Sequence, residues 1–409
     1  MIERSAMIDS VSSLDDYLAF AIERSPALRS SYYNWKAASE ISGYAGALPD
    51  PVLTYGYFIE NVETRVGPQN KRVGLRQSFP WFGTLGAKKA MASEGAQAAN
   101  HQFESERLRL IYQVKAAYYD YYFLAQDITI TSANLELMTF WESVARTKYK
   151  TALGKHPDVI RAQVELGLLE DRLLSLQDMI GPAVARLRAA VNLPDSTPVS
   201  IPGGIAVAEL NLGKTAIISS VREYNPNLRS IEHLIEKEKA GIRLAKKAYF
   251  PSFTVGVDYI ETGPAMNPAT PQSGKDPWIV GVGVNLPIWF GKNNARKQEA
   301  IARHKQAEYN LQDAENQLTA YTERALFEHN DALRKLRLYR DGLIPKAEQS
   351  LNASYTAYQA GELDFLNVLD AQRQLLEFQR QYERAKADLG IRAAELEMLT
   401  GKPTRELTN

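Results

Sequence analysis

Residues 51–83 read PVLTYGYFIENVETRVGPQNKRVGLRQSFPWFG, two alternating apolar stretches joined by a polar segment, and the pattern begins again at Pro251. Self-similarity of this kind indicates a duplicated structural unit. The sequence therefore predicts one fold built twice, with a first repeat over residues 1–200 and a second over residues 201–409. The matched positions are Pro51, Thr54, Gly56, Pro80 and Phe82-Gly83 in the first copy and Pro251, Thr254, Gly256, Pro287 and Phe290-Gly291 in the second.

Apolar residues alternate with small or polar residues along both copies, and a period of two is that of a β-strand. Such alternation is typical of a membrane β-barrel with lipid outside and a polar lumen inside, and equally of a half-buried soluble sheet. The predicted strands are 52–59, 72–79, 253–260 and 278–286, with a polar loop over residues 61–71. On the membrane interpretation Tyr55, Val73, Val255 and Val282 face lipid, whereas Arg72, Arg76, Asp258 and Asn285 face the lumen.

Long helical rods are predicted after each strand pair. The segment 84–153 has no proline and would span about 100 Å at 1.5 Å per residue, and its apolar residues recur at the spacing of a coiled-coil seam. The rod of the second repeat contains Gly342 and Pro345, which predict a kink near its middle. The four long helices are expected at about 84–153, 158–191, 292–360 and 365–399.

Shorter helices precede both strand pairs. Ser13 and Asp16 have the spacing of a capping box, and Pro26 starts a second helix at a position where its missing N–H costs nothing. A linker rich in proline and glycine over residues 195–213 separates the two repeats. The first 18 residues lack the apolar core of a secretory signal and a cysteine for a lipid anchor. We therefore expect either a cytoplasmic protein or a chain from which a leader has been removed.

Composition excludes several classes of protein. Lys and Arg total 48 and so do Asp and Glu, which leaves no basic excess for nucleic acid. Cysteine is absent, so disulfides, thiolate metal sites and a cysteine nucleophile are impossible. The five histidines have no metal-ligand spacing, and we find no phosphate-binding loop or nucleophile elbow. We expect no cofactor, no metal and no enzymatic activity. The sequence contains no run of about 18 apolar residues, so it predicts no transmembrane helix.

Four strands do not close a barrel of useful width, and an open sheet edge in lipid would leave unpaired backbone groups at several kcal/mol each. Two long rods with apolar seams on two sides cannot cover those seams within one chain either. If the strands lie in a membrane, the sequence therefore requires several copies to complete both the sheet and the helical layer.

The chain resembles the outer-membrane efflux proteins, the TolC-like outer-membrane factors. The motifs that carry the resemblance are SerProAla at 25–27, PDPVLTYG at 49–56, ETRVGPQ at 63–69, SFPWFG at 78–83 and AspAlaGln at 370–372. The resemblance implies a mainly α fold with a transmembrane β part, in which a homotrimer forms a 12-stranded barrel in outer-membrane lipid and a long helical barrel in the periplasm of a Gram-negative bacterium.

The function that the resemblance implies is a passive exit duct of a tripartite efflux or type I secretion system. Its partners would be a periplasmic adaptor (membrane fusion) protein and an inner-membrane transporter of the RND or ABC type. The family's second hairpin turn often carries two pore-facing aspartates, and here the corresponding positions are Asn367 and Asp370. Tyr358 and Asp158 match two other residues of the periplasmic gate, whereas the family's basic residue after the turn glycine is Leu363. Asp158 also fits the carboxylate of a helix N-terminus.

Two other functions stay open from the residues alone. A soluble coiled-coil scaffold with small assembly sheets is favoured by the missing signal sequence. An enzyme acting on cell-wall material would need paired carboxylates in a cleft, and the candidates all lie on rods and turns.

Overall fold

The computed structural model describes residues 13–200, 202–209, 213–403 and 406. They form two compact units, each built from both halves of the sequence. The sheet unit comprises Tyr32–His101 and Leu228–Asp313, and the helical unit comprises the residues up to Ser31, Gln102–Asn227 and the residues from Ala314 onward. Residues 1–12, on which the expectation about a leader rests, lie outside the described residues. Residues 201 and 210–212, at and within the predicted linker, also lie outside them.

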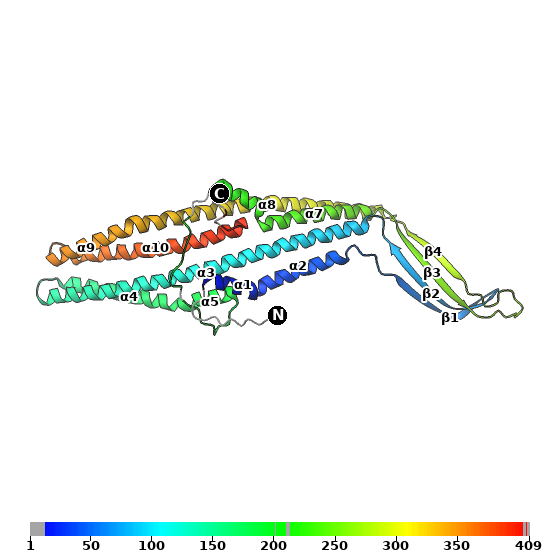
Figure 1. The fold of residues 1–409 in the computed structure, drawn as a ribbon, viewed down its shortest axis with the longest axis horizontal. Helices are drawn as coiled ribbons and strands as arrows, with labels where there is room; N and C mark the ends of the chain where they lie inside the picture. Colours follow the sequence, from blue (N-terminus) through cyan, green and yellow to red (C-terminus); the bar gives the residue numbers. More distant parts are fainter. Residues whose placement is uncertain (1–12, 201, 210–212, 404–405, 407–409) are drawn as a thin grey trace. The chain divides into compact units, whose positions relative to one another are not determined.

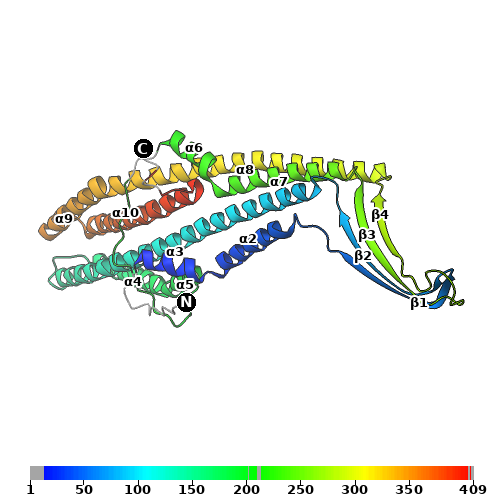
Figure 2. The ribbon, with the colours of Figure 1, turned by 45° about the vertical axis from the view of Figure 1, so that its right-hand side comes forward.

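The sheet unit contains a four-stranded antiparallel sheet in the order β1-β2-β3-β4 (Figures 1 and 2). The prediction of four strands is confirmed, but the predicted polar loop over residues 61–71 is wrong. Strands β1 and β2 run through that region and meet at a tight turn, because Gly67 adopts a φ of +131° that only glycine takes easily. The strands are β1 (Val52–Thr64), β2 (Gly67–Phe79), β3 (Ser252–Thr262) and β4 (Trp278–Asn285).

Helices precede each strand pair of the sheet unit, as predicted. Helix α2 (Pro26–Tyr44) leads into β1, and α7 (Pro226–Lys247) leads into β3. Both begin with a proline, whose lack of an N–H is tolerated at the first helical position.

The helical unit begins with α1 (Leu14–Arg24), which has the predicted capping box. The Ser13 hydroxyl accepts from the N–H of Asp16, and the Asp16 carboxylate accepts from the N–H of Ser13. Helix α3 (Thr84–Lys150) confirms the first long rod over 67 residues. The return helix is divided into α4 (His156–Asp178) and α5 (Ile180–Val191), so the prediction of one continuous helix is wrong. Pro182 explains the break, because it has no N–H to donate to the carbonyl of Asp178.

The second rod is also interrupted. Helix α8 (Phe290–Leu338) passes into a π-helical segment, Tyr339–Leu343, which is followed by α9 (Ile344–Ala360). Gly342 and Pro345 lie at this point, as the sequence predicted, and Pro345 cannot donate in the α-helical register. The turn at Gly361, with a φ of +78°, leads to α10 (Phe365–Thr400). Helix α6 (Lys214–Tyr224) starts the second half of the helical unit.

The helical unit has buried layers of aromatic and aliphatic side chains. Tyr17, Tyr121 and Tyr122 lie in the layer between α1, α3 and α5, and Met138, Trp141 and Phe365 lie in the layer nearest the hairpin turns. Within the described part of the chain, no helix has the length and apolar character needed to cross a membrane.

We predict that Gly390→Ala destabilises the helical unit by about 1–3 kcal/mol, because overpacking strains a close contact. A Cβ at Gly390 would lie 2.7 Å from the Tyr119 ring, so α10 could no longer approach α3 this closely. Gly167→Ala on α4 is the matched control, since its Cβ would meet nothing within 4 Å. This control should be neutral or stabilising by up to about 1 kcal/mol. Denaturant unfolding of both variants measures the difference, and equal midpoints would contradict the prediction.

Candidate functional site

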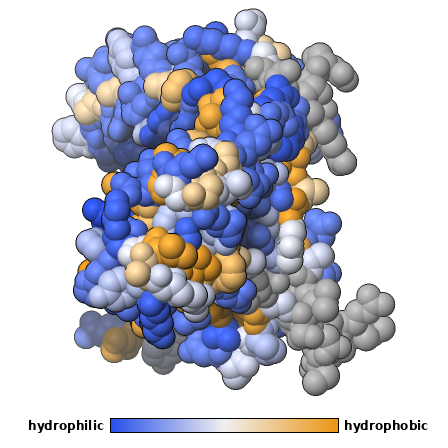
Figure 3. All heavy atoms as spheres, turned by 90° about the vertical axis from the view of Figure 1, so that its left-hand side faces the viewer, coloured by the Kyte–Doolittle hydropathy of each residue, from blue (hydrophilic) through white to orange (hydrophobic). Residues whose placement is uncertain are grey.

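The residues predicted to carry function lie in two places, the turns of the helical unit and the strands of the sheet unit. In the helical unit the turns join α3 to α4 and α9 to α10. Figure 3 shows this end of the helical unit as largely hydrophilic, with apolar side chains in separate patches.

An exposed ion pair connects the two hairpin turns. Lys155 Nζ, just before α4, donates to Asp364 Oδ1 at the start of α10 over 2.7 Å. The hydrogen bond and charge of Lys155 lower the pKa of Asp364. The sequence reasoning missed this pair, because turns that lie some 200 residues apart give no signal of their proximity in a single sequence.

Lys148 makes a second connection between the hairpins. Its Nζ donates to the backbone carbonyls of Tyr358 at 2.7 Å and Gln359 at 3.1 Å, and it lies 4.4 Å from the centre of the Tyr358 ring. A cation at the carboxyl end of a helix is favourable both for the unpaired carbonyls and for the helix dipole. Lys148 therefore fixes the end of α9 against the end of α3. It too was missed from sequence.

Asp158 and Tyr358 are both buried beneath these contacts. Burial raises the pKa of Asp158 above its ordinary value of 3.8, against the opposing effect of Arg161, whose guanidinium lies 3.9 Å away. Burial, and then the charge of Asp158, raises the pKa of Tyr358 to about 12. The Tyr358 hydroxyl has no hydrogen-bond partner among the described residues. The structure thus brings these two predicted gate residues together.

The other two predicted gate residues are exposed on the first turns of α10. Asn367 donates to the backbone carbonyl of Asp364 over 3.2 Å. The Asp370 side chain is 64% exposed, and its carboxylate lies 3.9 Å from the Arg373 guanidinium. The four predicted residues therefore divide into a buried pair and an exposed pair.

Ion pairs also join the two hairpins farther from the turns. Arg373 of α10 donates to Glu165 of α4, and Arg380 of α10 donates through Nε to the buried Asp127 of α3 over 2.7 Å. Asp120 of α3 accepts from Arg186 of α5 and Arg384 of α10. These charged groups favour one relative register of the helices, although each exposed pair contributes little stability.

In the sheet unit the strand register separates the predicted strand residues onto two faces. Tyr55 pairs with Val73, and Val255 pairs with Val282, on the same face. The alternation along β2 and β3 brings these two pairs to one side of the sheet. The opposite face carries Arg72, Arg76, Asp258 and Asn285.

The polar face is organised by Asp258. Arg72 donates to both of its carboxylate oxygens, at 3.1 and 2.8 Å, and Arg76 lies 3.8 Å from one of them. Gly74 makes room for this cluster, because a Cβ there would lie 2.1 Å from Asp258 Oδ1. A glycine is therefore required between the two arginines.

Most side chains of the apolar face are exposed, among them Tyr55, Val73 and Val282, whereas Phe253 and Val257 of β3 are half-buried. Towards the β1–β2 turn it ends at Lys71, which is paired with Glu261 at 3.2 Å, and at Tyr259 beside Trp278. Towards the helices it ends at Phe79. Between Lys71 and Phe79 strand β2 rises about 27 Å at about 3.4 Å per residue. At the strand tilt of about 35–45° in membrane barrels this length covers about 20 Å of an apolar band about 25 Å tall.

The part of the chain that the structure describes contains no group of three His, Cys, Asp or Glu side chains that could hold a metal ion. His101 stacks on His233 at 5.2 Å, and His233 Nδ1 lies 2.7 Å from Glu94. These are contacts between neighbouring helices α3 and α7.

Comparison with known proteins gives consistent matches. The family model described as outer membrane efflux protein matches residues 217–402. Outer membrane efflux protein BepC of Brucella suis is 22% identical over 96% of this chain and 86% of its own length. Outer membrane protein TolC of Vibrio cholerae is 22% identical over 93% of this chain and 89% of its own. The crystal structure of VceC from Vibrio cholerae superimposes with a TM-score of 0.78 at 18% identity, over 95% of this chain and 96% of that one.

We predict that Asp158→Asn makes the protein more stable than wild type at pH 7 and that this difference narrows as the pH falls towards 4. The pKa of Asp158 is raised on folding, so the wild-type chain loses stability as the pH rises through that pKa, whereas asparagine does not titrate. Thermal unfolding in detergent at several pH values measures the difference. A variant that is less stable than wild type at pH 7 would show that the ionised carboxylate is favoured.

Proposed function

We propose that this chain is an outer membrane efflux protein, as its match to that family model and its similarity to BepC and TolC support. Three copies then assemble into the passive exit duct of a tripartite efflux or type I secretion system. The single observation that supports this most strongly is the exposed apolar face of the sheet, which lies opposite a face of arginine, aspartate and glycine.

The sheet of one chain ends in two open edges among the described strands, β1 and β4. Unpaired backbone groups cost several kcal/mol each in lipid. Pairing β4 of one copy with β1 of the next removes both edges, and three copies give 12 strands around a lumen. Arg72, Arg76, Asp258 and Asn285 then face the lumen, and Tyr55, Val73, Val255 and Val282 face lipid.

The helical unit forms the periplasmic part of the duct in this proposal. Its exposed hairpin turns meet a periplasmic adaptor, and an inner-membrane transporter of the RND or ABC type supplies energy and selects the substrate. The protein itself performs no chemistry on that substrate. A soluble scaffold, the second candidate, is disfavoured because an apolar face of this extent would be exposed to water.

Insertion into lipid tests this function directly. Val282→Arg should cost about 2–4 kcal/mol near the bilayer midplane and so prevent insertion as a trimer. Asn285→Arg is the matched control on the opposite face of the same strand and should insert like wild type. Assembly in lipid vesicles and light scattering in detergent provide the readouts. A stable folded monomer, or equal insertion of both variants, would overturn the proposal.

Asp370 is proposed to set the ion preference of the periplasmic mouth. Three exposed carboxylates around one axis attract cations and repel one another, more strongly in a narrow opening than in water. Asp370→Asn should weaken the preference for cations and leave the closed conductance unchanged, because it removes charge but little volume. Planar-bilayer recordings with a salt gradient measure the reversal potential. An unchanged reversal potential would show that this ring does not select ions.

A further inference from the structure

The two helices that follow the strand pairs begin with the same arrangement of aromatic and basic residues. Residues 81–89 read WFGTLGAKK and residues 289–297 read WFGKNNARK, so an aromatic pair is followed seven residues later by a basic pair in both. Helix α7 ends in Lys246-Lys247, next to Tyr249-Phe250. Three helix ends of the sheet unit therefore combine aromatic rings with cations.

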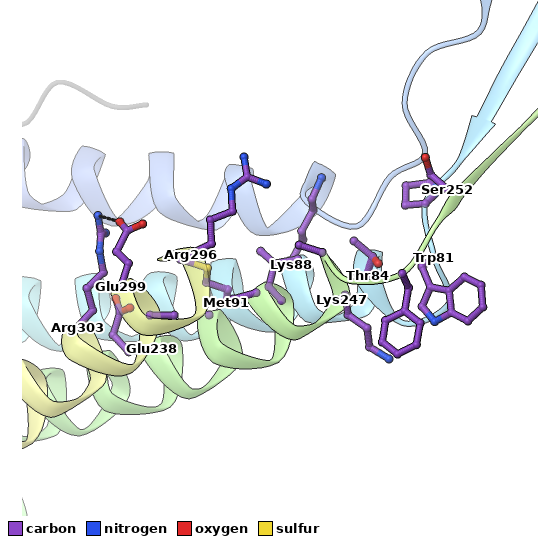
Figure 4. Close-up of a pocket in the computed structure, with 17 residues that line it drawn as sticks. Trp81, Thr84, Lys88, Met91, Glu238, Lys247, Ser252, Arg296, Glu299 and Arg303 are labelled. Carbon is purple, nitrogen blue, oxygen red and sulfur yellow. Dashed lines mark hydrogen bonds and ion pairs between the residues drawn. The ribbon is translucent and has the colours of Figure 1, made fainter. Parts of the chain in front are cut away.

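One groove of the sheet unit, with a volume of about 480 Å³, lies between the ends of α3, α7 and α8 (Figure 4). Five of these aromatic and basic residues line it: Trp81, Lys88, Lys247, Phe250 and Arg296. Trp81 forms part of its wall and stacks on Phe250 at 5.0 Å. Figure 4 shows Trp81 at the strand end of the groove and Arg303 at the other end, with Lys88 and Arg296 between them. The groove is large enough for a small ligand or a headgroup.

The groove is continuous with the apolar face of the sheet. Trp81 also stacks on Phe253 at 5.9 Å. Phe253 pairs with Phe79 and Val284, on the face that carries Val255 and Val282. A molecule in the groove can thus extend its apolar part along the surface that faces lipid.

The charge of the groove favours an anion. Four cationic side chains line it, against two glutamates, Glu238 and Glu299. Glu299 is paired with Arg303 at 2.7 Å. Lys88 and Arg296 are exposed and have no ion-pair partner among the residues that the structure describes. These two side chains remain available for a ligand.

We propose that this groove binds the headgroup of an anionic phospholipid from the periplasmic leaflet, an assignment that rests on the proposed membrane function. Lys88 and Arg296 contact the phosphate, and the acyl chains lie against Trp81 and Phe253. A long basic side chain can keep its charge at the headgroup while its stem covers apolar surface, and aromatic rings favour this interfacial depth. A zwitterionic headgroup would bring its own cation into a groove that is already positive.

Lipid binding to the purified trimer tests this site. Native mass spectrometry would compare phosphatidylglycerol with phosphatidylethanolamine, with glycerol phosphate as a soluble competitor. In Lys88→Gln/Arg296→Gln the affinity for phosphatidylglycerol should fall by about tenfold, because each basic residue near an anionic lipid contributes to binding. The affinity for phosphatidylethanolamine should change little. Lys305→Gln/Lys346→Gln, which removes two exposed lysines outside the groove, is the matched control and should bind like wild type.

Several outcomes would overturn the proposal. If phosphatidylglycerol binds the groove variant as it binds wild type, Lys88 and Arg296 do not contact the lipid. If glycerol phosphate displaces the lipid at concentrations similar to those of the lipid, the groove is a site for a soluble anion. If the groove variant does not fold, Lys88→Arg/Arg296→Lys keeps both charges and must retain lipid selectivity. Failure of the wild-type chain to form a trimer would instead contradict the proposed function, so the two failures are distinguishable.

Discussion

The fold depends on a sheet that one chain cannot complete. Its two outer strands have free edges, and one face is largely apolar and largely exposed. Neither the backbone hydrogen bonding of the edges nor the burial of this face is therefore complete among the described residues. Lipid can cover the apolar face, and only further strands can satisfy the edges. The polar face shows the complementary design, because Gly74 leaves space for Asp258 to hold two arginines above the sheet.

In the helical unit, close packing and charge have separate roles. Gly390 permits contact between α10 and the Tyr119 ring, and the aromatic layers bury the apolar seams of the rods. Ion pairs also connect the two hairpins, one between Arg380 and the buried Asp127 and one between the exposed Lys155 and Asp364. Packed apolar side chains exclude water and fix the helices at close distance, whereas the ion pairs join particular residues of one hairpin to particular residues of the other. Packing and ion pairs therefore act together to set which residues of the two hairpins are opposite each other.

Much of this fold follows from local sequence patterns. Three short-range signals are confirmed: the period-two alternation around Thr54 and Thr254, the long proline-free run after Thr84 and the capping box at Ser13. The extension of β1 and β2 through polar residues was missed, because the pairing of the two strands outweighs the low strand propensity of asparagine and glycine there. Lys148, Lys155 and Asp364 were missed because their roles arise from contacts between hairpins some 200 residues apart. Asp158 and Tyr358 were predicted as gate residues only through the resemblance, and their role in a gate stays a prediction.

The π-helical segment Tyr339–Leu343 has a consequence for symmetry. One additional residue in a helix rotates everything after it by about 100° relative to everything before it. The rod of the first repeat has no such insertion over Thr84–Lys150, so beyond this level the two rods present their seams in different phases. In a ring of alternating rods, the duplicated sequence would support near-sixfold equivalence on the strand side of the insertion. On the side of the hairpin turns, the equivalence in the proposed trimer would be reduced to threefold, and the two kinds of hairpin would form different surfaces.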